Sequence, residues 1–467
     1  MSGQYLSERE VFDLLSDFES KHNPYNLWVN DVSVWQILRP RIASKLQNAQ
    51  LEKASIPKIE RFLAYADFFS FIKLLKNRGV KYCAFTNYSG YRNSHLGRYE
   101  DIWFDHILDN FPGGVKIARI DARGFRNNIK QARIKPLYDI STFEKAAGLL
   151  SRVAPIQDKD AVYEKVTKLA NKLLGHEHFT SASVQIQVSR FFWISRFYRI
   201  ILKLLKPKKV IFVGTNEFAL IHASKKEKIR SIEFQHGIFS KHHAYTLPLL
   251  SESLTEKLIF PDVIGLYGKF WESELRGTIF DQRKILNVLG NFSLEKYKKM
   301  RIERFKNSDS ISIIVTTQGI EREKIIIFFK DFLKSFSRDL RITFKLHPSY
   351  DPNSSAYDEL KILDSRVTIL SGNEGKSTFE LIALSDLHLS IASACHYDSL
   401  SIGTPTLVLA MAGAEIMEPI IRSGYSDLLY ESSDLIRYLD KHFTKPIEVD
   451  DEFFCKKEFF KNLERLM

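Results

Sequence analysis

The sequence predicts an α/β fold made of two Rossmann-like domains, with a cleft between them and a helical N-terminal extension. Three observations carry this prediction. Short apolar runs rich in Val and Ile recur along the chain and stop at glycine or polar residues, as buried parallel strands do. Segments with the 3.6-residue period of helices lie between many of these runs. The length of 467 residues, 44% of them hydrophobic, is enough for more than one core.

The first Rossmann-like domain is predicted over residues 76–298, after a helical, aromatic-rich extension over residues 1–75. Its clearest unit is "KKVIFVGTNEFALIHASKKEKIRSIEFQHG", residues 208–237. There a strand ending at Gly214 leads through an amphipathic helix into a second strand, which is the βαβ unit of a parallel sheet. Three further strands are expected within residues 79–93, 261–268 and 284–292.

The second Rossmann-like domain is predicted over residues 299–440, with the boundary in the charged stretch 295–308. Helices expected over residues 321–336 and 376–384 alternate with apolar runs, which is the rhythm of a doubly wound sheet. The strands are expected within residues 310–319, 341–348, 367–370, 386–391 and 404–410. Residues 441–467 are expected to form a C-terminal helix.

Charge and cysteine content restrict the partners and the compartment. The chain has 68 Lys and Arg against 56 Asp and Glu, a net charge of +12 that favours anionic partners. The basic residues are spread through helices and not gathered in a tail, so we expect no nucleic-acid partner. The three cysteines are far apart, with no CxxC, which disfavours disulfides. We therefore expect a cytoplasmic protein, with a peripheral place on the anionic inner face of a membrane left open.

Candidate ligand-binding residues follow the strands of the second half, because parallel sheets bind ligands at the carboxyl ends of their strands. Lys345 and His347 alternate along one strand, so both side chains can point to the same face and offer positive charge to a phosphate. A histidine that only caps the strand end is the alternative for His347. The expected donor-binding set consists of hydroxyls, an amide and cations: Thr317, Gln318, Lys345, His347, Ser390 and Ser393.

The stretch "SIASACHYDSLSIGTPTLVLA", residues 390–410, predicts a nucleotide-binding turn. Serines follow a strand end there, and Asp398 lies on a short helix that ends at Gly403. A carboxylate in this place can accept both hydroxyls of a ribose, while the N–H groups at the helix start face a phosphate. Asp398 as a surface charge or helix cap is the alternative.

In the first half, "EFQHG" ends a predicted strand with His236, and Glu233 lies three residues earlier. His242 and His243 follow, but adjacent histidines point in different directions and are unusual joint zinc ligands. We therefore expect no metal site. The alternatives for His236 are a contact with substrate and a purely structural turn.

Two further segments allow a functional and a structural interpretation. Asp101 and Asp105 fall on one face of a predicted helix over residues 97–109, where a solvated amphipathic surface is the favoured interpretation. The aromatic and basic helix expected over residues 189–209 could lie on an anionic membrane. Core packing ahead of the next strand is its favoured interpretation.

Three motifs in order resemble a known class of enzymes. "D-S-L-S-I-G-T-P" is similar to the E…G-x-P signature of GT-B glycosyltransferases, with Asp398 in the place of the usual ribose-binding glutamate. "K-L-H-P" resembles the HP motif of bacterial sialyltransferases, polysialyltransferases and teichoic-acid polyol-phosphate polymerases. "E-F-Q-H-G" is similar to the QHG or WHG loop of capsule and teichoic-acid enzymes. The resemblance covers roughly residues 80–440 and implies a nucleotide sugar held by the C-terminal domain.

The resemblance implies a metal-independent glycosyltransferase acting on a bacterial surface polysaccharide, with a nucleotide sugar as substrate and no separate cofactor. The donor is expected to be CMP-linked by analogy with the HP motif, and the acceptor a growing, lipid-linked glycan. Lys345, His347, Ser393 and Thr317 would stabilise the departing phosphate. His236 or Glu233 would act as base, or His236 would donate to the donor phosphate. A CDP-polyol-dependent polyol-phosphate transferase and a catalytically silent assembly protein are the alternatives.

Overall fold

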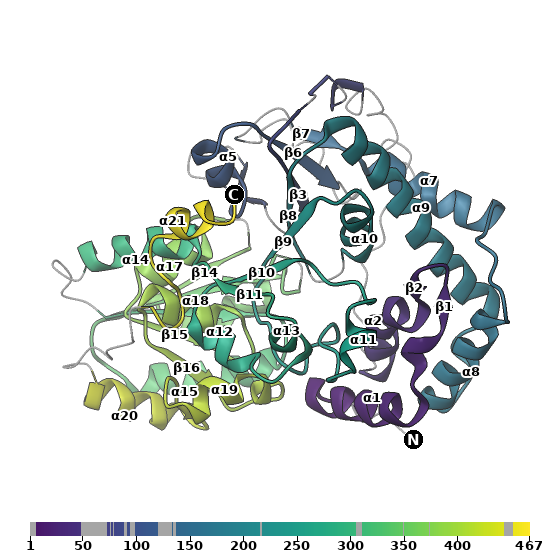
Figure 1. Cartoon of the computed structure of the whole chain (residues 1–467). Coiled ribbons are helices and arrows are strands. Elements are labelled where there is room, and N and C mark those ends of the chain that lie inside the picture. The colour runs from purple at the N-terminus through teal and green to yellow at the C-terminus, as the bar shows by residue number, and fades with distance from the viewer. Residues whose placement is uncertain are drawn as a thin grey trace.

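The structure, a computed structural model, shows two α/β bodies side by side with a helical segment against the first (Figure 1). It describes residues 6–47, 72–74, 76–77, 79–87, 91–93, 99–119, 133, 137–214, 217–304, 311–348, 350–372, 374–442 and 452–467.

The N-terminal extension is built from two helices joined by a small hairpin. Helix α1 (Glu8–His22) starts with a capping box, in which Ser7 and Glu10 exchange hydrogen bonds with each other's backbone N–H groups. A short 3-10 turn (η1, Pro24–Asn26) and the antiparallel strands β1 (Trp28–Val29) and β2 (Val32–Ser33) lead into α2 (Val34–Leu46). Helix α2 packs against helices of the first domain, which makes the extension part of that domain's core.

The first domain contains a seven-stranded sheet in the order β11-β10-β9-β8-β3-β6-β7, and every pair in it is parallel. All the strands predicted for this half are present, and β6 and β7 are two that the sequence did not reveal. The strands are β3 (Tyr82–Asn87), β6 (Gly114–Arg119), β7 (Leu137–Asp139), β8 (Lys209–Val213), β9 (Arg230–Phe234), β10 (Val263–Leu266) and β11 (Leu286–Val288).

Helices cover this sheet, and the longest of them contains most of residues 189–209, for which a membrane-surface helix and a core-packing helix were both considered. Helix α9 (Ser181–Leu205) buries Phe191, Phe192 and Tyr198, so its favoured interpretation as a core-packing helix is confirmed. The other helices are α5 (Asp105–Asn110), α7 (Ser141–Val153), α8 (Val162–Leu174), α10 (Phe218–Lys226), α11 (Glu252–Thr255), α12 (Lys269–Glu274) and α13 (Ile279–Gln282). A separate antiparallel pair joins β4 (Tyr91–Asn93) to β5 (Tyr99–Asp101). Within the described ranges, no helix is both long and apolar enough to cross a membrane.

The second domain contains a six-stranded parallel sheet in the order β14-β13-β12-β15-β16-β17. The strands are β12 (Ile311–Thr317), β13 (Leu340–Leu346), β14 (Val367–Leu370), β15 (Leu387–Ser390), β16 (Thr406–Leu409) and β17 (Leu428–Leu429). Its helical elements are α14 (Phe292–Arg304), α15 (Arg322–Ser335), η3 (Ser354–Tyr357), α16 (Asp358–Leu363), α17 (Thr378–Ala383), α18 (Cys395–Ile402), η4 (Ala414–Met417), α19 (Glu418–Arg422) and α20 (Ser432–His442). Every residue of β15 and β16 is buried, as expected when helices cover both faces. The predicted fold class, two Rossmann-like domains of the GT-B type, is confirmed.

The chain crosses between the domains twice. Helix α14 packs against α17 and α18 of the second domain, and the predicted boundary between residues 298 and 299 falls within it. The C-terminal segment then returns to the first domain, where α21 (Phe459–Glu464) packs beside the sheet (Figure 1). The backbone N–H of Lys456 donates to the Tyr267 carbonyl at 2.8 Å on the way. Phe459 and Leu463 of α21 then pack with Ile211, Ile232 and Phe234 on one face of the first domain's sheet.

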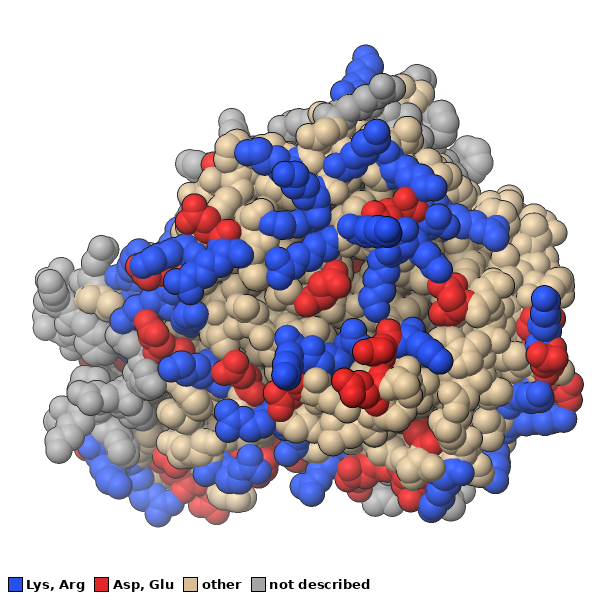
Figure 2. Space-filling model, in the orientation of Figure 1, with Lys and Arg blue, Asp and Glu red and all other residues tan. Residues whose placement is uncertain are grey.

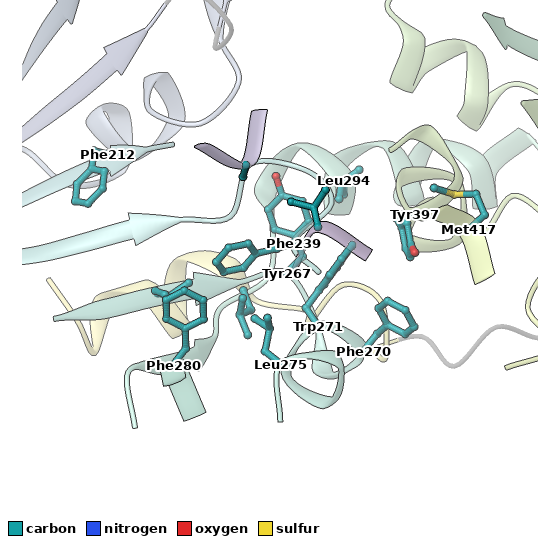
Figure 3. Packing of buried hydrophobic residues seen from close by; sticks show 14 of the residues in the cluster. Phe212, Phe239, Tyr267, Phe270, Trp271, Leu275, Phe280, Leu294, Tyr397 and Met417 are labelled. Carbon is teal, nitrogen blue, oxygen red and sulfur yellow. The ribbon is translucent and has the colours of Figure 1, made fainter. Parts of the chain in front are cut away.

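Aromatic side chains fill the junction of the two domains. Phe270 and Trp271 of α12 contact the Tyr397 ring of α18, with ring centroids 5.4 Å and 4.6 Å away, and all three are buried (Figure 3). Burial of large aromatic rings is among the strongest contributions to an interface. This contact fixes where the start of α18 lies relative to the first sheet.

Candidate functional site

The carboxyl ends of the two sheets face each other at the loop that follows β9. Because all pairs in each sheet are parallel, the strand ends of a domain gather at one edge. A Cβ atom placed on Gly237 would lie 3.7 Å from the Cβ of Ala394, the residue before α18. His236 and Ser393, each next to one of these residues, are therefore brought to the same place from different domains.

Gln235 holds the β9 loop in position. Its Oε1 accepts the backbone N–H of Tyr267 at 2.9 Å, and its Nε2 donates to the Gly237 carbonyl at 2.7 Å. Gly237 has a φ of +106°, a conformation that glycine adopts without strain. The buried amide of Gln235 thus ties the ends of β9 and β10 together, and His236 projects from a fixed turn.

His236 is exposed, and the indole of Trp103 lies against its ring. The two ring centroids are 5.5 Å apart with an interplanar angle of 28°, a stacked arrangement. The indole Nε1 of Trp103 also donates to the Tyr267 hydroxyl at 3.4 Å. Sequence reasoning missed Trp103, because 133 positions of the chain (236 − 103) separate it from the histidine. The charges of Asp101 and Asp105 were the only feature of the sequence that drew attention to this segment.

Glu233 lies behind His236 at a small enclosed space. A cavity of about 40 Å³ is lined by Glu233, Gln235, His236, Ile238, Phe239 and His243. Burial raises the pKa of Glu233 to about 8, because the low-dielectric interior disfavours its charged form. Glu233 therefore carries a proton at pH 7 and offers a hydrogen-bond donor to this cavity.

His242 and His243 are packing residues of the same loop. The His242 ring contacts Phe12 of the N-terminal extension edge to face, at 5.6 Å. The His243 ring stacks on Tyr245 at 5.0 Å, and burial lowers the pKa of His243 to about 4. Among the residues that the structure describes, no group of three or more His, Cys, Asp or Glu side chains is arranged to hold a metal ion.

The N-terminal extension supports this loop from behind. The Arg39 guanidinium is fully buried, pairs with Glu19 at 2.7 Å, and donates to the Ala244 carbonyl. The Gln36 side chain exchanges two hydrogen bonds with the Ile259 backbone, at 2.8 and 2.9 Å. A buried charge is tolerated only when it is paired and hydrogen-bonded. These contacts make the extension a structural support of the loop that carries His236.

In the second domain, Thr317 is engaged by a buried carboxylate. Its Oγ1 donates to Asp351 at 2.6 Å, and Asp351 also accepts from the Tyr357 hydroxyl and pairs with Arg322, each at 2.7 Å. We call these four residues the Asp351 cluster. The cluster ties the end of β12 to the loop that follows β13. Gln318 comes directly after Thr317 and is partly buried.

Lys345 and His347 leave β13 with different environments. Lys345 is buried and its Nζ donates to the carbonyls of Ser371 and Glu374, so it holds the loop after β14. Burial lowers the pKa of Lys345. The Nδ1 of His347 accepts the backbone N–H of Tyr350 at 3.1 Å, and the two rings stack at 4.4 Å. Neutral His347 therefore carries its proton on Nε2, where it is a donor.

Ser390 and Ser393 flank the turn that starts α18. The Ser390 Oγ donates to the Thr316 carbonyl at 2.7 Å, whereas the Ser393 Oγ accepts the Cys395 backbone N–H at 3.2 Å. Both serines are buried. Ser393 thus shapes the start of the helix, at the point where it meets the β9 loop.

Below this turn lies a buried chain of histidines and threonines that sequence reasoning missed. His388 joins Thr316 and Thr406 at 2.9 and 2.7 Å, and His396 joins the same Thr406 hydroxyl at 2.6 Å. Burial lowers the pKa of both imidazoles, the largest cause in each case. Both histidines are therefore neutral supports of the loop between β15 and α18.

Asp398 lies on α18 and is partly buried. The pKa of the Tyr267 phenol is raised, first by burial and next by the negative charge of Asp398. The Asp398 carboxylate therefore lies near enough to the Tyr267 phenol of the first domain for its charge to act on that group. By contrast, His347 follows β13, which is two strands from β15 in the sheet order, a separation of roughly 10 Å.

Asp101 and Asp105 do not lie on a solvated helix, and that expectation is wrong. Asp101 ends β5, Asp105 is the first residue of α5, and both are fully buried. The buried Lys116 of β6 pairs with Asp105, and the Thr86 hydroxyl donates to Asp101 at 2.6 Å. Partners supplied by distant strands compensate the burial of these carboxylates.

A larger hollow of about 600 Å³ opens elsewhere on the second domain, lined by residues 333–339 and 364–366. These residues precede β13 and β14, so the hollow lies at the amino ends of the strands. It is therefore on the edge of the sheet opposite to the candidate site.

Solved structures of similar shape include sugar-nucleotide epimerases and a polymerase. The UDP-GlcNAc 2-epimerase from Methanocaldococcus jannaschii, in complex with UDP-GlcNAc and UDP, is 12% identical, with 82% of this chain and 99% of that chain covered and a TM-score of 0.47. The UDP-GlcNAc 2-epimerase from Neisseria meningitidis, bound to UDP-GlcNAc, is 17% identical, with 83% and 99% covered and a TM-score of 0.49. A variant of the wall teichoic acid polymerase TagF with CDPG is 11% identical, with 88% and 93% covered and a TM-score of 0.42.

Identities this low and TM-scores below 0.5 say nothing about the chemistry of this chain. The sequence matches no protein-family model and no curated protein.

Proposed function

We propose that this chain is a metal-independent glycosyltransferase that moves a sugar from a nucleotide-activated donor to a growing bacterial surface glycan. One observation carries the proposal. An exposed histidine at the end of a strand in one domain lies opposite the start of a helix in the other, with Gly237 and Ala394 in contact distance. This arrangement supports the proposal, because a histidine that could transfer a proton and a helix start that could face a phosphate would then meet between two Rossmann-like domains.

The second domain supplies the donor side in this proposal. The start of α18 is the positive end of its helix dipole, which would favour a phosphate next to Ser393. His347 follows β13 on the same edge of the sheet, and the Nε2–H of its neutral imidazole would be a further hydrogen-bond donor there. Asp398, whose charge acts on Tyr267 of the first domain, would accept the ribose hydroxyls of the nucleotide. Lys345 and Thr317 would act indirectly, because each already holds a loop of this edge.

The first domain supplies the acceptor side. His236 would take the proton of an acceptor hydroxyl as its oxygen forms the bond to the anomeric carbon, while the nucleotide phosphate leaves with the electron pair of the broken bond. A CMP-linked sugar is the first donor to test. If His236 instead donates to the donor phosphate, the reaction would not need the unprotonated imidazole.

The acceptor would be a lipid-linked glycan at the inner face of the membrane, with the enzyme in the cytoplasm. The net charge of +12 supports this part of the proposal, because anionic head groups attract basic surfaces. Figure 2 shows Lys and Arg side chains gathered over the upper part of one face. Sedimentation with vesicles of anionic or neutral lipid tests it: binding that requires the anionic lipid is expected, and equal binding to both would contradict it.

Thermal-shift measurements with CMP, CDP, UDP and GDP test the donor site. A nucleotide that binds only the folded state raises the melting temperature, by a few degrees at a concentration about 100-fold above Kd. We expect one nucleotide to do so, and Asp398→Asn to abolish the shift. Asp427→Asn is the matched control, since Asp427 is an exposed acid of the same domain. No stabilisation by any of the four nucleotides would contradict the donor-site assignment.

Radiolabelled donors then separate the transferase from its alternative. Transfer of label from the sugar alone is the expected result. Transfer of phosphorus from a CDP-polyol into the product would instead identify a polyol-phosphate transferase.

A further inference from the structure

The turn at residues 101–105 is held by buried charge that the proposed reaction does not use. The Asp101 Oδ1 accepts the backbone N–H groups of Trp103 and Phe104, both at 3.1 Å. The other oxygen of Asp101 accepts the Thr86 hydroxyl at 2.6 Å. Three hydrogen bonds to one buried carboxylate fix the backbone from which the Trp103 side chain leaves.

Asp105 fixes the same turn from its other end. Its Oδ2 accepts the backbone N–H of Asp101 at 3.1 Å, and its Oδ1 pairs with the buried Lys116. The Arg133 guanidinium lies 3.6 Å from the Asp105 carboxylate. Buried charges are costly unless they are paired, so an arrangement of this kind over-determines one backbone conformation. The pair of acids therefore serves to hold residue 103.

The Trp103 side chain is fixed at two further points. Its indole Nε1 donates to the Tyr267 hydroxyl at 3.4 Å, and Tyr267 is buried and joined through its backbone N–H to Gln235. Gln235 directly precedes His236. The indole face then lies against the imidazole, 5.5 Å between centroids. The ring that covers His236 and the backbone that carries His236 are thus held by the same small network.

On the basis of the proposed transferase function, we propose that Trp103 is a positioning residue for His236. The indole face restricts rotation of the exposed imidazole, so that its nitrogen meets the acceptor hydroxyl in one orientation. The same face attracts the imidazolium that forms when His236 takes the proton. Asp101 and Asp105 act one step further away by holding Trp103. Trp103 itself does not touch the reacting atoms.

Steady-state turnover in three variants tests this role. Trp103→Leu removes the aromatic face and is expected to lower kcat by about 10- to 100-fold, with the donor KM unchanged, because misplacement of a catalytic group acts on turnover. Trp103→Phe keeps an aromatic face without the Nε1–H and is expected to recover most of the loss. Trp193→Leu is the matched control. Trp193 is also partly buried, but it lies on α9, with the Arg196 guanidinium carbon 4.5 Å from its ring centroid. The kcat of the Trp193→Leu variant should therefore stay unchanged.

A spectroscopic measurement tests the contact without any substrate. In protein labelled at histidine, the ring-proton signal of His236 is assigned by its loss in His236→Ala. The indole ring current displaces this signal, so Trp103→Leu is expected to move it markedly and Trp193→Leu is expected to leave it in place. An unchanged His236 signal in Trp103→Leu would overturn the proposal.

The outcomes separate this inference from the proposed function. If His236→Ala is inactive and Trp103→Leu keeps full turnover, the positioning role falls and the transferase stands. If His236→Ala keeps full turnover, the assignment of His236 falls and the role of Trp103 falls with it. Loss in Trp103→Leu with recovery in Trp103→Phe supports both.

Discussion

The loop after β9 in the first domain and the strand ends of the second domain differ in what their polar groups already do. His236 is exposed at the end of its strand, held by an aromatic face and a glycine turn. In the second domain, Thr317, Lys345 and Ser390 are buried and hydrogen-bonded to neighbouring loops. The first-domain edge therefore presents a titratable side chain at its surface. At the second-domain edge, the polar side chains are already bonded to the loops around the start of α18.

A polar residue at the end of a strand can thus serve the fold or a ligand. A hydroxyl or a lysine there serves the loops as readily as it serves a ligand, because buried backbone carbonyls need donors. Only a side chain whose environment leaves it at the surface of the edge, such as His236, is a strong catalytic candidate. We expect substitution of His236 to act on turnover, and substitution of the buried residues at the strand ends of the second domain to act on stability.

The largest effect should come from His236→Ala. Loss of the base is expected to lower turnover by about 10²- to 10⁴-fold while the melting temperature stays unchanged, because the side chain is exposed. His242→Ala is the control, since that histidine packs against Phe12. Single-turnover kinetics with labelled donor measure the effect. Unchanged surface polysaccharide in cells that carry either His236→Ala or His347→Ala would point instead to a catalytically silent assembly protein.

Next in size is the effect of opening the Asp351 cluster. Asp351→Ala removes the acceptor shared by Thr317, Tyr357 and Arg322, and is expected to lower the free energy of unfolding by about 3–5 kcal/mol. Urea denaturation measures it, with the exposed Asp358→Ala as control. If Asp351→Ala left stability intact and abolished nucleotide binding, the second-domain edge would be a ligand shell and the contrast between the two edges would disappear.

The sequence was sufficient for the fold wherever a strand is a continuous apolar run. "VIFV" and "SIIV" are recognised as buried strands because they are short, rich in Val and Ile, and followed by glycine or polar residues. Strand β6 was missed because Lys116 interrupts its apolar pattern, and the carboxylate that compensates this lysine comes from Asp105 on another element. Strand β7 spans only Leu137–Asp139, too few residues for a period to show.

Only those parts of the candidate site that follow from the order and direction of the strands were predictable from the sequence. His236 and Ser393 could be placed at facing edges because parallel strands end together. Trp103 and Asp351 could not, since what makes them important is a contact with residues far away in the sequence or in another loop. Asp101 and Asp105 were noticed for their charge but assigned to a solvated face, because local sequence does not show that Lys116 and Thr86 meet them.

Glu233→Gln should change how the free energy of unfolding depends on pH, because Glu233 is a buried acid. The native pKa of about 8 is raised from 4.5, so the folded state binds this proton more tightly than the unfolded state. Stability from this group is therefore fully present below about pH 4.5 and is lost as the pH rises towards 8. Glutamine has no such proton, so the variant should match the natural protein at pH 4.5 and exceed its unfolding free energy by about 2–4 kcal/mol at pH 8.

Urea denaturation of both proteins from pH 4.5 to 8.5 provides the measurement. His243, whose pKa is lowered to about 4, contributes the opposite slope at acid pH in both proteins and cancels in the difference. A difference between the two proteins that stays constant with pH would show that Glu233 is ionised in the folded state. It would then be a base in the cavity next to His236, and the first-domain loop would hold two candidate bases.

The smallest effect should separate backbone strain from function within the first domain. Gly237 and Gly175 both have positive φ, +106° and +74°, so an alanine at either position is expected to cost about 1–2 kcal/mol of stability. A Cβ on Gly175 would have no neighbour within 4 Å, and one on Gly237 would make only an ordinary contact with Ala394 at 3.7 Å. Contacts of the added Cβ should thus cost little at either position in urea, and the strain should be somewhat greater at Gly237, whose φ lies further from the left-handed helical region. Only Gly237→Ala should also lower turnover, by about 10-fold, because it disturbs the carbonyl that Gln235 holds next to His236. A clearly larger loss of stability in Gly237→Ala would mean that the two domains press together at this point, and that the loop after β9 is part of the rigid frame after all.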